Sequence, residues 1–127
     1  MMISKTISSL FALFLAITLG HAAVADTVFS GAITNSQTWS TDGSPYILSG
    51  NVEIGNAAVV VIQPGVLVLM ETNASLTVQE GVLSAQGTSD NPIVITSSQE
   101  STGIPSPGDW GTLAFTSNPG GVESTLI

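Results

Sequence analysis

The sequence of 127 residues has no cysteine, one histidine and a single basic side chain among Lys and Arg. Lys5 and His21 both precede residue 26, so the remainder carries all nine acidic residues and no basic one. Without Lys or Arg nothing neutralises phosphates, which argues against a nucleic-acid partner. Without His or Cys there is no ordinary catalytic triad, activated thiol or typical zinc site. We therefore expect no catalytic, cofactor-binding or metal-binding residue, no cofactor, and no enzyme activity in this chain.

The absence of cysteine also limits how the fold is stabilised. Export would permit disulfides, but none can form here, so stability must come from packing and backbone hydrogen bonds. The acidic, lysine-free composition suits an extracellular setting, where carboxylates keep a protein soluble.

The first residues are typical of a signal peptide. Lys5 precedes an apolar run at 10–17, and small residues follow, ending in Ala23-Val24-Ala25. We predict a signal peptide at 1–25, with cleavage after Ala25 and Ala23 as the second choice. The apolar run is short for a membrane-spanning helix, so we expect no transmembrane segment in the mature chain. The protein is then expected to be secreted or held at the cell surface.

One segment of the remaining chain occurs twice. The sequence from Val60 to Leu67 is matched sixteen residues later, from Leu76 to Leu83, with Gln, Gly, Val and Leu in the same order. A short period with alternating apolar residues and a fixed glycine is typical of a coil that stacks on itself. We interpret the two segments as adjacent coils of a solenoid.

The rest of the chain indicates an all-β fold. No segment after the signal peptide has the period of an amphipathic helix, and Gly, Asn, Ser and Pro supply the corners between short strands. A sandwich would have similar strands, but it does not usually repeat residues at a fixed offset, so we predict a parallel β-helix. A strand is expected to start at 46–48, and further strands are expected at 51–55, 59–63, 66–71, 76–78, 82–85, 92–96, 112–116 and 122–127.

Four apolar residues are expected to form inward stacks: Ile54, Ile62, Val78 and Ile95. Residues 66–70 are apolar on both faces of their strand, so the pattern leaves open which side points inward.

The two ends of a solenoid need caps, because each coil buries its faces only against its neighbours. We assign 26–49 as an N-terminal cap segment, with Phe29, Ile33 and Trp39 as its packing residues, and 50–127 as β-helix coils. Leu126 and Ile127 end in mid-strand and would leave apolar side chains and edge groups open. We therefore expect the N-terminal part of a longer protein, truncated at its C-terminus and prone to self-association through its edge.

A series of motifs carries a family resemblance: Ser44-Pro45-Tyr46, Gln63-Pro64-Gly65, Leu76-Thr77-Val78, Leu83-Ser84-Ala85-Gln86-Gly87-Thr88, Asn91-Pro92-Ile93 and Gly108-Asp109-Trp110-Gly111. In this order, over about 33–127, it resembles the opening coils of secreted bacterial right-handed parallel β-helix proteins with the pectin-lyase-like fold. The resemblance implies a family of surface proteins, adhesins and polysaccharide-active enzymes. Its enzymes use Asp clusters, often with Arg, Lys or Ca²⁺, on central coils, and no such residue carries over to this chain.

Two pairs of acidic residues invite a functional interpretation. Glu71 and Glu80 would form a carboxylate pair if they lay on successive coils, but we favour solvated turn residues. Asp90 and Asp109 would bind Ca²⁺ in corner loops, yet such a site needs six to eight oxygens, so we favour structural turn residues.

Single residues have similar alternatives. Trp110 is either a platform for stacking on sugars or, as we favour, a structural anchor, and we assign Trp39 to packing in the cap. Asn73 begins an N-glycosylation tripeptide, but a corner residue with positive φ is the better interpretation. The Ser and Thr residues lack the regular ladder expected of an ice-binding face.

These observations favour a non-catalytic structural or recognition module of a secreted or cell-surface β-helix protein. Its expected partners are extracellular glycans or surface proteins. The alternative is an inert N-terminal scaffold of a polysaccharide lyase or hydrolase whose active site lies in downstream coils. A third hypothesis is a degraded product that does not fold.

Overall fold

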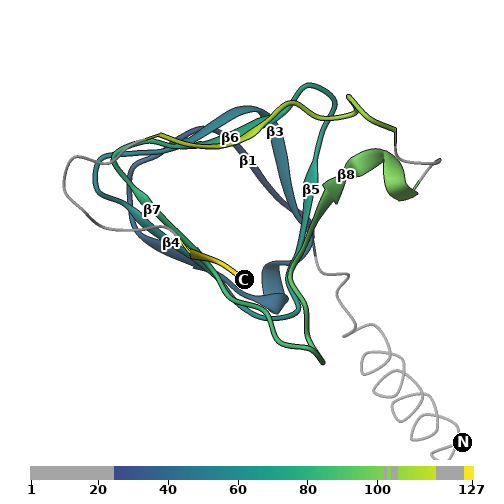
Figure 1. Cartoon of the computed structure of the whole chain (residues 1–127), viewed down its shortest axis with the longest axis horizontal. Helices are drawn as coiled ribbons and strands as arrows, with labels where there is room; N and C mark the ends of the chain where they lie inside the picture. The colour runs from purple at the N-terminus through teal and green to yellow at the C-terminus, as the bar shows by residue number, and fades with distance from the viewer. Residues whose placement is uncertain (1–24, 102, 104–105, 117–124) are drawn as a thin grey trace, which may run out of the picture.

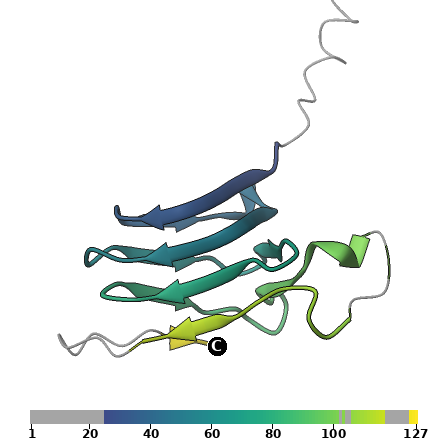
Figure 2. The ribbon, with the colours of Figure 1, turned by 90° about the horizontal axis from the view of Figure 1, so that it is seen from above.

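The computed structural model describes residues 25–101, 103, 106–116 and 125–127. The described strands wind into a coil of triangular cross-section (Figure 1), and successive turns stack along one axis (Figure 2). The stack has about three turns. All of the predicted signal peptide except Ala25, the expected turn at 118–121 and residues 122–124 of the last expected strand lie outside the described residues.

The described elements are short strands with two brief 3-10 turns. In chain order they are β1 (Thr27–Ile33), β2 (Gln37–Trp39), η1 (Thr41–Gly43), β3 (Tyr46–Ile54), β4 (Val59–Ile62), β5 (Leu67–Met70), β6 (Ser75–Val78), β7 (Val82–Ala85), β8 (Val94–Ser97), η2 (Ser98–Ser101), β9 (Leu113–Phe115) and β10 (Thr125–Leu126).

The strands form three walls around the axis. Wall A contains the first part of β1, the first part of β3, β5 and β8. Wall B contains the second parts of β1 and β3, with β6 and β9. Wall C contains β2, β4, β7 and β10. Every pairing among these strands is parallel, which confirms the prediction of an all-β parallel β-helix.

Two long strands turn the corner between walls A and B without a break. β3 bends at Gly50, whose φ is 67°, and β1 bends at Gly31, whose φ is 78° and which follows a register shift after Phe29. Glycine fits both bends because a side chain at positive φ crowds the backbone. The strand expected to start at 46–48 and the alternating segment expected at 51–55 therefore belong to one strand, β3, which ends at Ile54.

Side chains alternate between the interior of the coil and the outside in β4, β5 and β6. In β4, Val60 and Ile62 are buried, whereas Val59 and Val61 are exposed. Equivalent inward positions of successive coils stack in register, so the interior is a continuous apolar column. Its fully buried large side chains include Trp39, Leu48, Ile54, Ile62, Met70, Leu76 and Leu83.

The interpretation of the sixteen-residue match as two adjacent coils is wrong. Val60 lies in register with Leu83 on wall C, not with Leu76, whose partner is Val52 on wall B. One complete coil must pass three walls and three corners, so it needs more residues than the matched segments provide. The match instead relates the corner at 63–65, between walls C and A, to the corner at 79–81, between walls B and C, which is two corners later along the chain.

The matched corners also differ in backbone conformation. In Gln63-Pro64-Gly65 the residue with positive φ is Gly65, at 84°. In Gln79-Glu80-Gly81 it is Glu80, at 56°. Proline fixes φ at a negative value, so Pro64 cannot adopt the conformation of Glu80. Glycine therefore occurs at this shared position for a different physical reason in each corner.

The four residues predicted to form inward stacks all point inward, but on different walls. Ile54 and Val78 are register partners on wall B, whereas Ile62 belongs to wall C and Ile95 to wall A. The strand β5, which was ambiguous in sequence, buries Val68 and Met70. It leaves Leu67 and Leu69 half-buried on the outside. They continue an apolar outer stripe that includes Val28, which is 60% exposed.

The segment assigned as a cap, 26–49, contains β1, β2 and the start of β3. Its strands pair in register with β3 and β4, so it is built as a coil. Within it the rings of Phe29, Trp39 and Tyr46 contact one another, with centroids 5.1 Å apart for Phe29 and Trp39, 5.0 Å for Trp39 and Tyr46, and 6.2 Å for Phe29 and Tyr46. This aromatic group fills the interior at the N-terminal end of the stack.

Candidate recognition site

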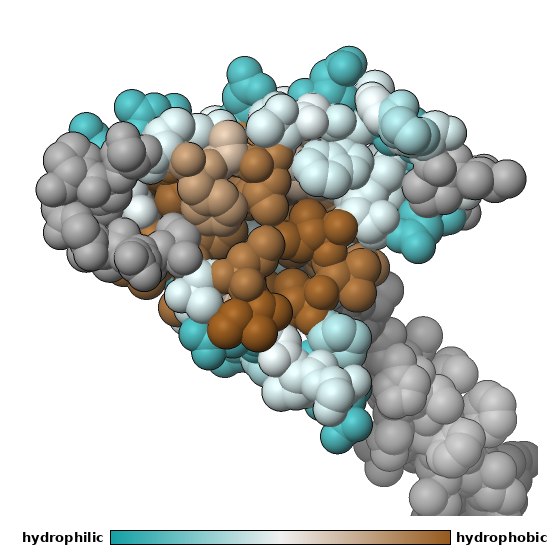
Figure 3. All heavy atoms as spheres, viewed as in Figure 1, coloured by the Kyte–Doolittle hydropathy of each residue, from teal (hydrophilic) through white to brown (hydrophobic). Residues whose placement is uncertain are grey.

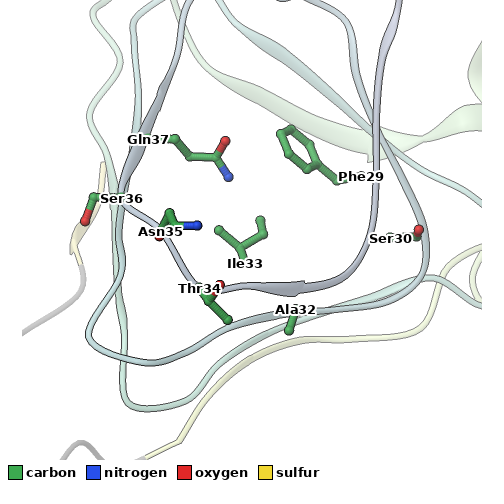
Figure 4. Close-up of a pocket in the computed structure, with 8 residues that line it drawn as sticks. All are labelled: Phe29, Ser30, Ala32, Ile33, Thr34, Asn35, Ser36 and Gln37. Atoms are coloured by element: carbon green, nitrogen blue, oxygen red, sulfur yellow. The ribbon is translucent and has the colours of Figure 1, made fainter.

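A hollow of about 250 Å³ opens at the N-terminal end of the solenoid. Eight consecutive or nearly consecutive residues of the first coil surround it, from Phe29 to Gln37 (Figure 4). The strand β1 supplies one side and β2 the other, and the corner at 34–36 joins them. This hollow is therefore made by one coil whose interior is not covered by a preceding described strand.

Side chains of two kinds point into the hollow. The ring of Phe29 and the side chain of Ile33 lie on the β1 side, and the amides of Asn35 and Gln37 approach from the other side (Figure 4). The side chains of Ser30 and Ser36 point away. The hollow thus combines an aromatic ring with amide donors and acceptors, which is the usual composition of a small-molecule site.

The two amides are available to a ligand. Neither Asn35 nor Gln37 forms a side-chain hydrogen bond with any other residue that the structure describes. Gln37 occupies an inward position, in register with the buried Val60 and Leu83 on the two following coils. An amide at the end of an otherwise apolar column is a local departure from the core pattern, and such departures often mark function.

The corner between the two sides is held by the next coil. The amide of Asn56 donates to the carbonyl oxygen of Thr34 at 3.4 Å, and the backbone N–H of Val59 donates to Ser36 Oγ at 2.9 Å. Below the hollow, Ser40 N–H donates to Tyr46 Oη at 2.9 Å, which fixes the aromatic group. The hollow is therefore hydrogen-bonded to the coil that follows it.

Trp39 is a buried member of the aromatic group and does not lie at the surface. It is 1% exposed, and its Nε1 is buried without a hydrogen-bond partner among the described residues. Its assignment to packing at the N-terminal end is consistent with this burial.

The acidic pairs proposed from the sequence do not come together. Glu71 follows β5, at the corner of walls A and B, whereas Glu80 follows β6, at the corner of walls B and C. Both residues are exposed. Asp90 is exposed in the loop before β8. Asp109 lies in the loop before β9, where its Oδ2 accepts from Ser106 N–H at 2.6 Å. No group of three His, Cys, Asp or Glu side chains gathers within the described part of the chain.

Trp110 and Asn73 have structural surroundings. Trp110 is partly buried and packs against the core, as expected of an anchor. Asn73 has a φ of 63°, as expected of a corner residue, and Ser75 Oγ accepts from Thr112 N–H at 3.3 Å. On wall C the outward Thr38 and Ser84 are separated by Val61, so a regular hydroxyl ladder does not form there.

Sequence reasoning missed the amides of the hollow. The only signal was the alternation in Gln37-Thr38-Trp39, which places Gln37 on the same side of the strand as the buried Trp39. That alternation could be used only once 37–39 was known to be a strand.

Among the helices of the described ranges, none combines the length and apolar character that crossing a membrane requires.

Comparison with known proteins gives one match. Residues 31–119 match the family described as the pectate-lyase like beta helix domain. The chain belongs to this family. Neither the curated proteins nor the solved structures contain a match to it. The pectate-lyase like beta helix family agrees with the parallel solenoid and with the pectin-lyase-like resemblance predicted from the sequence, and it relates the chain to carbohydrate-associated proteins. The matched range begins in β1 and includes all strands of the described coils up to β9.

Proposed function

We propose that this chain is a non-catalytic recognition module of a secreted or cell-surface β-helix protein and that it binds a neutral glycan. The observation that carries the proposal is the hollow of the first coil, where the ring of Phe29 faces the free amides of Asn35 and Gln37 (Figure 4). A sugar ring has apolar faces and a polar rim, so a ring beside amides suits it.

Charge supports a neutral ligand over an acidic one. All nine acidic residues lie beyond residue 25, and no Lys, Arg or His accompanies them. The field of such a chain disfavours a polyanion such as pectate. The carbohydrate association of the family supports a glycan in place of a protein partner.

The spread of the acidic residues supports a non-catalytic role. Hydrolysis of a glycosidic bond normally needs two carboxyl groups held on either side of it. Glu71 and Glu80 lie at different corners, and Asp109 is engaged in its own turn.

Isothermal titration calorimetry tests the proposal. The titrants are neutral β-linked gluco-, manno- and xylo-oligosaccharides and, separately, oligogalacturonate. We expect binding of a neutral oligosaccharide and none of oligogalacturonate. The variant Gln37→Leu should weaken binding about tenfold, since losing one hydrogen bond to a ligand costs about 1–1.5 kcal/mol.

Gln63→Leu is the matched control, because Gln63 is an exposed glutamine at a corner on wall C, away from the hollow. It should bind as the parent chain does. Equal loss in both variants, or a preference for oligogalacturonate, contradicts the proposed site.

The family match favours a second candidate, an inert scaffold at the start of a polysaccharide lyase or hydrolase. It predicts that the gene continues beyond Ile127 into coils with Asp beside Arg or Lys. Sequencing the locus distinguishes the two candidates, because a recognition module needs no such residues.

A further inference from the structure

The hollow at the N-terminal end has two chemically different sides. Phe29 and Ile33 give it an apolar side, and the carboxamides of Asn35 and Gln37 face them from the other side (Figure 4). Each carboxamide can donate hydrogen bonds through its NH₂ group and accept them through its oxygen. None of the described residues that line the hollow is charged. A ligand that fills it must therefore offer donors and acceptors on one side and an apolar group on the other.

The hollow is closed at its base. Three of its lining residues are register partners of residues in the next coil that are 0% exposed: Phe29 with Leu48, Ile33 with Ile54, and Gln37 with Val60. Viewed along the axis of the stack, apolar side chains fill the middle of the triangle (Figure 3), so a glycan chain cannot thread through it. The volume of about 250 Å³ lies below the range of about 300–1,000 Å³ that is usual for pockets of drug-sized ligands. The hollow thus suits one sugar unit at the end of a chain.

Charge limits the substituent that this sugar unit carries. An acidic substituent would enter the field of a chain with nine acidic residues and no Lys, Arg or His beyond residue 25. An ammonium group would lose water in the hollow without meeting a carboxylate among the described lining residues, which costs free energy. The substituent that fits the hollow is therefore neutral.

An acetamido group matches both sides of the hollow. Its N–H donates, its carbonyl oxygen accepts, and its methyl group is apolar, so the two carboxamides and the apolar side are all satisfied by one planar group. A hydroxyl group in the same place supplies a donor and an acceptor but no methyl group to contact Ile33.

We propose that the hollow is a subsite for one N-acetylated hexosamine unit at the end of a neutral glycan. The acetamido group lies between the carboxamides of Asn35 and Gln37 and the apolar side formed by Phe29 and Ile33. This inference rests on the proposed function, because it names the sugar that the same hollow takes.

Isothermal titration calorimetry with two trisaccharides tests the proposal. Triacetylchitotriose and cellotriose are both neutral, β-linked and of equal length, and they differ in carrying an acetamido or a hydroxyl group on each sugar ring. The protein is the whole chain, secreted from a bacterial host so that any leader is processed. We expect triacetylchitotriose to bind at least about tenfold more tightly, because it gains a hydrogen bond and an apolar contact.

The outcomes separate this inference from the proposed function. Equal or tighter binding of cellotriose, or of a manno- or xylo-oligosaccharide, overturns the assignment of an acetamido group and leaves glycan binding in place. Binding of no neutral oligosaccharide overturns both.

The same acetamido group occurs on proteins as acetyl-lysine, so an acetyl-lysine peptide is a further titrant. It should bind at least about tenfold more weakly than triacetylchitotriose, because it has no sugar ring to contact Phe29. Equal binding would show that the hollow takes a modified protein, and it would overturn the assignment to a glycan.

Variants locate the recognition through the ratio of the two trisaccharide affinities. Gln37→Leu should reduce the preference for triacetylchitotriose to about twofold or less, because Leu can neither donate nor accept a hydrogen bond. It should fold, since it places an apolar side chain in register with the buried Val60. Asn35→Ala, at an exposed corner position, is a second test of the same ratio.

Ser30→Ala is the matched control, because Ser30 lines the hollow but its side chain points away (Figure 4). It should keep the full preference for triacetylchitotriose. Circular dichroism checks that each variant is folded. An unchanged preference in both Gln37→Leu and Asn35→Ala, or a lost preference in Ser30→Ala, contradicts the proposed subsite.

Discussion

Val61 lies beside Ser84 in the parallel register of wall C, whereas Thr77, sixteen residues after Val61, lies on wall B. This relationship identifies the residues that occupy equivalent positions in successive coils. The conspicuous match in sequence relates two different corners of the triangle, with a third corner between them along the chain. The less visible pairing of Val61 with Ser84 relates neighbouring coils.

Disulfide trapping checks this register. The chain has no cysteine of its own, so pairs can be introduced cleanly. Adjacent strands are about 4.8 Å apart, which is within reach of a disulfide. The double variant Val61→Cys with Ser84→Cys should form an intramolecular disulfide, detected by mass spectrometry under non-reducing conditions. Val61→Cys with Thr77→Cys should stay reduced, and a disulfide in that pair would contradict the assignment of the walls.

Neighbouring valines should respond differently to truncation. Val60 is fully buried, whereas Val61 is 37% exposed. Val60→Ala should lower the free energy of unfolding by about 2 kcal/mol through lost burial and a residual cavity. Val61→Ala should cost no more than about 1 kcal/mol, which is the range of strand propensity. Urea unfolding measures both. Equal costs would mean that β4 does not alternate as described.

Substituting the glycine of each matched corner should change the stability of the fold for a different physical reason. A Cβ on Gly81 would lie 2.8 Å from the carbonyl oxygen of Ile54, whereas a Cβ on Gly65 would meet nothing closer than 3.5 Å. Gly81→Asn should therefore destabilise the fold by about 1–3 kcal/mol through overpacking. Gly65→Asn should cost less than about 1 kcal/mol, because Asn tolerates positive φ. Thermal unfolding compares the stability of the two variants. The reverse order would show that the strain of a side chain at the positive φ of Gly65 outweighs the crowding at Gly81.

The hydroxyl of Tyr46 should contribute separately from its ring. Ser40 N–H donates to this hydroxyl, and the ring stacks on Trp39. Tyr46→Phe should cost about 1–2 kcal/mol by leaving the Ser40 N–H without its acceptor. Tyr46→Leu should cost about a further 0.5–1.5 kcal/mol through the lost ring contact. Chemical denaturation of the series measures both steps. An unchanged stability in Tyr46→Phe would mean that the hydrogen bond has no net effect.

Much of the fold was predictable because strand physics is local. Alternation at 52–54 and 59–62 follows from the period of the β-strand, and Asn73 and Gly65 follow from the conformations that corners demand. The bend of β3 at Gly50 and the role of 27–39 as a coil were not predictable, because neither leaves an alternation long enough to recognise.

The sequence by itself determined the class of the protein. Its alternation and turn residues required short β-strands that stack. The tertiary structure alone decided the register, which set Leu83 instead of Leu76 above Val60. It also decided that Asn35 and Gln37 share a hollow with Phe29. The physical reason is that a strand has a fixed period of two, while the length of a coil depends on three corners whose conformations are settled only when the walls pack together.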